Sequence, residues 1–206
     1  MSKKSSTLPN MLLALVVIAV VAAAALACVY ALTKKPIEDQ QKQVVNNAIK
    51  NVLPGFNGKT ERLAVVARDG DKDSVIVYLA KDANGELFGA AVETYTKKAF
   101  SGSFKIMVGF DSVGNVIGTD VIESSETPGL GDKIKTPEFS GQFAGNKGHK
   151  INPRASEYGV KVKKDGGEVD AITAATISSR AYCDAVNRAA EAYDKVLNLK
   201  KKGVNQ

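Results

Sequence analysis

The chain has 206 residues, 44% hydrophobic and 24% charged, which suits one globular domain with an appendage and argues against a largely disordered protein. The net charge is +6, but the lysines are scattered and form no basic stripe with interleaved aromatic residues, so we expect no nucleic-acid partner. The two cysteines, Cys28 and Cys183, make neither a disulfide framework nor a metal-binding set.

The first element is an uncharged apolar run from Met11 to Leu32. A bilayer core of about 30 Å is crossed by about 20 apolar residues of helix, so we predict a transmembrane helix in membrane lipid over residues 11–32, after a short tail over residues 1–10. A cleaved signal peptide is an alternative, although its apolar region is usually only about 7 to 15 residues long. A lipoprotein signal is another, because "ALAC" ends at Cys28, although Ala25 stands where a larger aliphatic residue is usual.

The charges on either side of this run do not orient it. Lys3 and Lys4 flank one end and Lys34 and Lys35 flank the other, so the positive charges are nearly balanced. Beyond the lysines, apolar residues recur at helical spacing until Pro54-Gly55, which is a helix stop signal. We therefore predict a stalk helix over residues 33–55.

From Phe56 the pattern changes to β-branched runs between turn residues, which predicts strands. The runs occupy residues 62–68, 74–80, 86–95, 103–111 and 116–124. Hairpins are predicted at Asn84-Gly85 and at Val113-Gly114-Asn115, and two further short strands in residues 158–164 and 168–173. We therefore expect an α+β fold with a mainly antiparallel sheet and packed helices over residues 56–199, followed by a flexible tail over residues 200–206.

The region from Thr127 to about Lys150 is rich in glycine and proline and has no strong period, which predicts a functional loop with short helical turns. Within "ESSETPGLGDKI", Pro128 stiffens the chain, and Gly129 and Gly131 allow positive φ or close approach. Three neighbouring side chains combine polar and apolar contacts suited to a flat heteroaromatic ring: Glu126, Thr127 and Leu130. On these residues alone, a plain Pro-Gly turn is the alternative.

The last predicted element is an amphipathic helix that follows "DAITAATISSR", residues 170–180, with Ser178 or Ser179 as its N-cap. The residues of its apolar stripe are Ala181, Ala185, Ala189, Tyr193, Val196 and Leu197.

A helix start exposes unpaired N–H groups and about half a positive charge, so it favours an anion. The small residues Ala174 and Ala175 allow the backbone to approach a ligand, and nearby hydroxyls can bind phosphate oxygens: those of Thr173, Thr176 and Ser178. A simple helix cap is the alternative on these residues alone.

Together, "SETPGLG" and "DAITAATISS" behind one N-terminal span resemble the G subunit of the Rnf electron-transport complex. The related C subunit of the sodium-pumping NADH:quinone reductase shares the FMN-binding domain but is usually longer. The family motif reads Ser/Thr-Gly-Ala-Thr, then Ser or Thr one residue later, and its second threonine carries FMN through a phosphoester bond. On this chain the resemblance implies covalent FMN at Thr176. The expected cofactor-binding residues are Glu126, Thr127, Leu130, Gly131, Thr173, Ala174, Ala175, Ile177 and Ser178.

One residue departs from the motif, because Ala174 stands where the family has glycine. If this position needs positive φ, alanine costs about 1 kcal/mol. The resemblance also implies further Rnf subunits as partners, a separate flavin transferase that uses FAD and a divalent metal, and a single pass through the cell membrane. The N-terminus would be cytoplasmic and the flavin domain extracytoplasmic.

The chain lacks a nucleophile–base pair and a cysteine cluster for iron–sulfur, so any redox chemistry would come from the flavin. We expect a membrane-anchored electron carrier, without a complete active site of its own, in a ferredoxin:NAD⁺ oxidoreductase complex coupled to Na⁺ or H⁺ translocation. The alternatives are the quinone reductase C subunit and a non-redox binding module without cofactor. The only histidine, His149, is expected at the surface, and Cys183 is expected to be a structural thiol.

Overall fold

The computed structural model describes residues 8–82, 84–144, 153 and 159–203. The chain divides into two compact units, Met1–Val44 and Val45–Gln206.

One uninterrupted helix, α1 (Leu8–Val52), contains the predicted span and residues 33–52 of the predicted stalk, and Pro36 lies inside it. It is long and apolar enough to cross a membrane. Its apolar side chains are exposed, including Leu12 at 63% and Ile18 at 69%. A helix that exposes apolar side chains in this way is compatible with a lipid environment.

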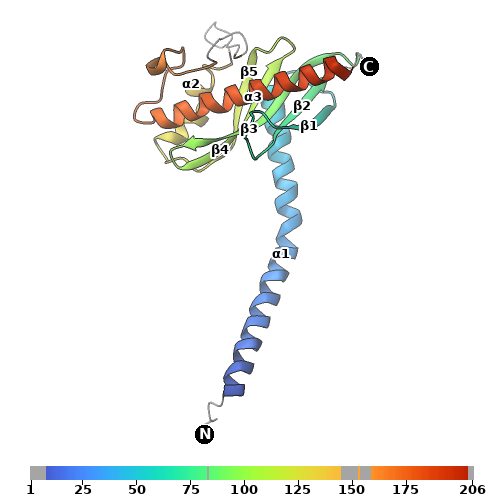
Figure 1. Cartoon of the computed structure of the whole chain (residues 1–206), viewed down its shortest axis with the longest axis vertical. Helices are drawn as coiled ribbons and strands as arrows, with labels where there is room; N and C mark the ends of the chain where they lie inside the picture. The colour runs from blue at the N-terminus through green and yellow to red at the C-terminus, as the bar shows by residue number, and fades with distance from the viewer. Residues whose placement is uncertain (1–7, 83, 145–152, 154–158, 204–206) are drawn as a thin grey trace. The chain divides into compact units, whose positions relative to one another are not determined.

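The second unit contains a five-stranded antiparallel sheet in the order β1-β2-β3-β4-β5 (Figure 1). The strands are β1 (Thr60–Val65), β2 (Val75–Lys81), β3 (Leu87–Ala99), β4 (Gly102–Asp111) and β5 (Val116–Ser124). Both predicted hairpins are present, and Gly85 and Gly114 have φ values of +84° and +102° in their turns, a conformation that glycine adopts without steric cost. The predicted α+β class is confirmed.

Helices cover the two faces of this sheet. The last helix, α3 (Thr176–Gly203), packs on one face, and the end of α1 packs on the other. The predicted stripe of α3 is confirmed, because Ala181, Ala185, Ala189 and Tyr193 are each 0% exposed. Since α3 continues to Gly203, it includes the first residues of the predicted tail.

Two glycines allow the end of α1 to lie directly on the sheet. Gly109 and Gly118 are cross-strand partners on β4 and β5. A Cβ at Gly109 would lie 2.1 Å from the Val52 carbonyl oxygen, and one at Gly118 would lie 2.8 Å from the Val52 Cα. Because neither glycine has a side chain, the Val52 backbone can lie in the space above this pair.

The prediction of two strands in residues 158–164 and 168–173 is wrong. The described residues of this region form one parallel bridge, Val162 with Val169, around the 3-10 helix η2 (Lys163–Asp165). Gly166 follows η2 with φ +81°, so the chain reverses too soon for a longer ladder. His149 lies outside the described residues.

Candidate functional site

The loop after β5 begins with a tight turn. The Thr127 carbonyl accepts a hydrogen bond from the Leu130 N–H at 3.2 Å, and Gly129 has φ +77°. Proline followed by a glycine of positive φ is the pattern of a type II turn. The 3-10 helix η1 (Gly131–Lys135) and the short helix α2 (Pro137–Ser140) come next, which confirms the prediction of a loop with short helical turns.

This loop contacts the start of α3 through a buried hydrogen bond. Ser178 Oγ donates to Glu126 Oε2 at 2.9 Å, and the two residues are 1% and 6% exposed. Gly131 lies against the pair, since a Cβ there would be 2.2 Å from Glu126 Oε2 and 2.7 Å from Ser178 Oγ. Gly129 therefore meets the predicted need for positive φ, and Gly131 the predicted need for close approach.

The second oxygen of Glu126 holds the tip of the β3–β4 hairpin. Glu126 Oε1 accepts hydrogen bonds from the backbone N–H groups of Phe100 at 2.9 Å and Ser101 at 3.4 Å. We call Glu126, Gly131, Ser178 and the hairpin tip the Glu126 junction. It joins three segments at the end of the domain where α3 begins (Figure 1). Both carboxylate oxygens of Glu126 accept hydrogen bonds from the protein, so this side chain fixes the three segments relative to one another.

The helix α3 begins at Thr176, so Ser178 and Ser179 lie inside its first turn, and the prediction that either is the N-cap is wrong. Ser179 Oγ instead accepts from the Ile172 N–H at 3.0 Å and donates to the Ala175 carbonyl at 3.0 Å. The Ser179 hydroxyl, which was expected to cap the helix, therefore bonds to the Ile172–Ala175 loop that precedes it.

Ala174 is the residue of this loop with an unusual backbone conformation. Its φ is +62°, and no other non-glycine residue in the described part of the chain has positive φ. This left-handed conformation favours glycine. The position therefore does require the backbone that the motif's glycine supplies, and alanine adopts it here with strain.

The first turn of α3 leaves donors free. Within the described residues, the backbone N–H groups of Thr176, Ile177 and Ser178 have no backbone acceptor. Thr173 is exposed and Thr176 is half-buried. Neither hydroxyl forms a hydrogen bond with another residue that the structure describes. The start of a 28-residue helix thus presents free donors and a positive dipole end, where an anion is stabilised.

Apolar side chains are exposed on each of the three segments that meet at the Glu126 junction. Leu130 is 43% exposed, Ile177 is 49% exposed and Phe100 is 68% exposed. Leu130 and Ile177 were predicted as site residues, whereas Phe100 was not singled out from the sequence. The signal for Phe100 was an aromatic residue inside a turn of small polar residues, "AFSGSF".

The titratable side chains that follow Thr176 on α3 are engaged elsewhere. Arg180 donates to both oxygens of Asp165 at 2.6 and 2.7 Å, and this contact lowers the pKa of Asp165. Cys183 is 4% exposed, and burial raises the pKa of its thiol to about 12. It is protonated at neutral pH, as expected for a structural thiol.

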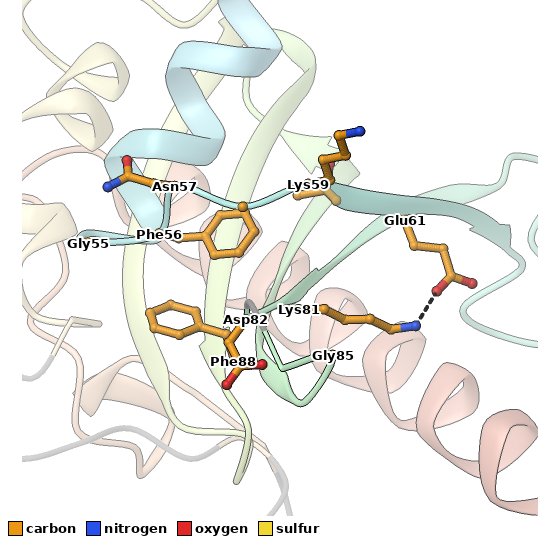
Figure 2. A pocket seen from close by; sticks show the side chains of 11 residues that line it. Gly55, Phe56, Asn57, Lys59, Glu61, Lys81, Asp82, Gly85 and Phe88 are labelled. Carbon is orange, nitrogen blue, oxygen red and sulfur yellow. Dashed lines mark ion pairs between the residues drawn. The ribbon is translucent and has the colours of Figure 1, made fainter.

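A cavity of about 800 Å³ lies near the β2–β3 turn, lined by residues 55–61 and by Lys81, Asp82, Gly85 and Phe88 (Figure 2). Figure 2 shows the two rings side by side, with centroids 5.5 Å apart. Phe88 is near the start of β3 and the Glu126 junction is at its other end; the strand's 13 residues span about 40 Å at ~3.3 Å per residue. The cavity is therefore separate from the junction.

Comparisons with known proteins identify two family regions. Residues 100–191 match the FMN-binding domain, and residues 13–52 match the RnfG N-terminal region. The G subunit of the ion-translocating oxidoreductase complex of Aliivibrio fischeri is 36% identical over 192 residues, which cover 89% of each chain. The G subunit of the same complex from Methanosarcina acetivorans is 34% identical over 188 residues, which cover 91% of this chain and 95% of the relative. The crystal structure of Shewanella oneidensis NqrC aligns with a TM-score of 0.47 and 23% identity, over 70% of each chain.

Proposed function

The chain belongs to the family of G subunits of ion-translocating oxidoreductase complexes and has the family's FMN-binding domain; we propose that it carries electrons through FMN bound covalently at Thr176. As a membrane-anchored flavoprotein it works among the other subunits of an Rnf-type complex. We propose that the complex transfers electrons between ferredoxin and NAD⁺ and couples this to Na⁺ or H⁺ translocation. When bound, FMN supplies the redox chemistry.

The start of α3 fits the phosphate of FMN. The observation that carries the proposal is the unbonded Thr176 hydroxyl beside the free N–H groups of the first helical turn. These donors can bind phosphate oxygens, and the helix dipole stabilises their negative charge. Thr173, with its exposed hydroxyl, supports the phosphate from the preceding loop. Ser178 contributes its N–H group, because its hydroxyl proton is donated to Glu126.

The exposed apolar side chains beside this helix start fit the ring of FMN. Leu130 precedes Gly131 and Ile177 precedes Ser178, and Gly131 and Ser178 contact each other, so Leu130 and Ile177 offer apolar surface close to Thr176. Ala174 and Ala175 keep the neighbouring loop small, and Thr127 forms the turn that presents Leu130. Apolar surface with a few placed polar groups suits a heteroaromatic ligand.

We propose that a separate transferase attaches the flavin. A threonine hydroxyl is weakly acidic and needs a base to become a nucleophile, and Arg180 and Cys183 do not serve as one. The transferase would move the FMN half of FAD to Thr176 Oγ with a divalent metal, leaving AMP. The left-handed backbone turn at Ala174 presents the segment to this enzyme.

The attachment test uses the full chain expressed with the transferase. We expect an FMN mass increment on the peptide that contains Thr176, and a flavin-fluorescent band that persists in SDS. Thr176→Ala should abolish both, whereas Thr173→Ala removes only a supporting hydroxyl and should keep the covalent flavin. A wild-type chain without flavin would overturn the proposal and favour a binding module without cofactor, and an increment on another residue would overturn Thr176 as the attachment residue.

We propose that the flavin domain faces away from the cytoplasm and that the short N-terminus is cytoplasmic. The apolar helix α1 supports a membrane anchor, and covalent attachment suits a compartment without a free FMN pool. Protease added to intact spheroplasts should digest the domain. Protection of the domain until the cells are lysed would contradict this orientation.

A further inference from the structure

We propose that Phe100 forms a wall of the flavin-ring site, held in place by Glu126. The inference rests on the proposed function, because its ligand is the flavin attached at Thr176. It adds a cofactor-contacting residue from the β3–β4 hairpin, a segment with no other residue in the expected site.

The first observation is the exposure of Phe100. It is 68% exposed, compared with 40% for Phe88, and it makes no ring contact within the described residues, whereas Phe88 packs on Phe56. Leaving a phenylalanine in water forgoes about 1.5–3 kcal/mol of burial. A single exposed apolar residue is common, so its exposure needs a second observation to suggest a ligand.

The second observation is that this exposed ring stands on a fixed backbone. The Phe100 N–H donates to Glu126 Oε1 at 2.9 Å, and Ser178 donates to the other oxygen of the same carboxylate at 2.9 Å. Glu126 is 6% exposed, and a hydrogen bond to a buried carboxylate is among the stronger ones in proteins. Two hydrogen bonds therefore fix the hairpin tip relative to α3, on which Thr176 lies two residues before Ser178.

The third observation is the chemistry of the neighbouring surface. Leu130 follows Gly129 in the loop held at the Glu126 junction, and Ile177 precedes Ser178; they are 43% and 49% exposed. With Phe100 they place three apolar side chains, from three segments, around one buried carboxylate. A flat aromatic ring tethered at Thr176 matches this surface, and aromatic pairs prefer offset or edge-to-face contact.

The flavin ring is the occupant we infer, in preference to a partner protein of the complex. Glu126 fixes Phe100 relative to the helix that carries the attachment residue. This arrangement would hold the Phe100 ring against a ligand bound at the start of that helix. The test therefore uses the isolated, flavinylated full chain in detergent, without the other proteins of the complex.

The experiment compares Phe100→Ala and Phe100→Tyr with Phe88→Ala, an exposed phenylalanine from the other end of β3. Each variant is checked for covalent flavin in SDS. The flavin's visible circular dichroism and its fluorescence quenching by iodide are then measured. An aromatic contact shifts an equilibrium by about two- to tenfold, so we expect Phe100→Ala to raise the iodide quenching constant about twofold or more and to weaken the dichroism, with Phe100→Tyr and Phe88→Ala close to wild type.

The outcomes separate the two proposals. A wild-type chain without covalent flavin overturns the proposed function, and this inference with it. A flavinylated Phe100→Ala chain with wild-type dichroism and quenching overturns this inference alone, as does an equal change in Phe88→Ala. If Phe100→Ala fails to take up flavin, Phe100→Leu replaces it: quenching above that of Phe100→Tyr supports the inference, and equal quenching overturns it.

Discussion

Four hydroxyl side chains precede or begin the last helix, and they differ in what they bind. Ser178 donates to Glu126 and Ser179 bonds to Ile172 and Ala175, so both hold the segment together. Thr173 and Thr176 are not bonded within the described residues. At the residue scale, the structural hydroxyls are therefore distinct from those available to a ligand.

Replacing Ala174 by glycine should relieve strain. A left-handed conformation costs a non-glycine residue about 1–2 kcal/mol, and the extra freedom of glycine in the unfolded chain offsets about 0.5–1 kcal/mol of this. Ala174→Gly, with φ +62°, should be up to about 1.5 kcal/mol more stable in urea and should take up flavin faster. The control Ala175→Gly, at a buried position, should be destabilised. A loss of stability in Ala174→Gly would contradict this account of the loop.

Removing the Glu126 carboxylate should loosen three segments together. Glu126→Ala leaves the buried Ser178 hydroxyl and the part-buried Phe100 N–H without their acceptor; an unsatisfied buried donor costs about 1–3 kcal/mol, and a lost hydrogen bond about 0.5–1.5 kcal/mol. We expect a loss of about 2–4 kcal/mol in urea unfolding, with a smaller loss in Glu126→Gln, which keeps one acceptor oxygen. Glu123→Ala, an exposed control on β5, should change stability little. Equal losses of stability in Glu126→Ala and Glu123→Ala would contradict the stabilising role of the Glu126 junction.

At the scale of elements, charged side chains bind α3 to the sheet. Asp184 accepts hydrogen bonds from Arg68 and Lys98, each at 2.8 Å, and from Thr96 at 3.0 Å. Burial by itself raises the pKa of Asp184, but the hydrogen bonds from Lys98 and Arg68 outweigh burial and hold this pKa below its ordinary value. The carboxylate form therefore stabilises the packing of α3.

The stability of the domain should fall in acid, partly because of Asp184. A lowered folded-state pKa gives stability that is present above the unfolded pKa of about 3.9 and is lost as pH falls through the folded pKa. Urea unfolding between pH 6 and 3 should show this loss in the wild type and a shallower slope below about pH 4 in Asp184→Asn. Asp69→Asn, a change at a fully exposed carboxylate, should keep the wild-type slope, and an unchanged slope in Asp184→Asn would contradict the prediction.

The contact between α1 and the sheet depends on Gly109 and Gly118. A methyl group at Gly109 would overlap the Val52 carbonyl oxygen at 2.1 Å, and overpacking of this kind typically costs about 1–3 kcal/mol. Gly109→Ala should lower stability by this amount and make the Val52 region more sensitive to protease. Lys105→Ala, an exposed change on the same strand, should do neither. A Gly109→Ala domain with wild-type stability would show that α1 does not pack here.

At the scale of the whole molecule, the chain combines a membrane helix with a folded domain, and these belong to separate compact units. The apolar side chains of residues 11–32 are exposed, whereas the apolar residues of α1 that pack on the sheet are buried, such as Ala48 at 2% and Val52 at 0%. One helix thus has a lipid-compatible part and a part that belongs to the domain core.

The membrane attachment should depend on residues 11–32. Wild-type chain should stay in the membrane pellet after alkaline carbonate extraction. A central arginine costs about 2.5–3.5 kcal/mol on insertion, so Val16→Arg with Val20→Arg should release the chain, whereas Ile37→Arg with Val44→Arg should not. An N-terminus found near Cys28 in the mature protein would instead support a cleaved signal.

Local patterns were sufficient for most elements of the fold. Alternation and turn residues predicted the five strands, because a strand's face and a hairpin's turn depend on neighbouring residues. The short strands of residues 158–173 were wrong because η2 and Gly166 reverse the chain after a single bridge. The N-cap was wrong because Ser179 bonds back to the Ile172–Ala175 loop.

The sequence alone determined the long apolar N-terminal helix, the antiparallel sheet, the amphipathic last helix and the motif that points to Thr176. These features depend on residues close together in the chain, where spacing and propensity act directly. Only the tertiary structure showed that Glu126 binds Ser178, 52 residues away, and Phe100, 26 residues away. Such partners are chosen by the packing of α3 and the loop after β5 at one end of the sheet, where a buried carboxylate must find donors, and no local pattern specifies them.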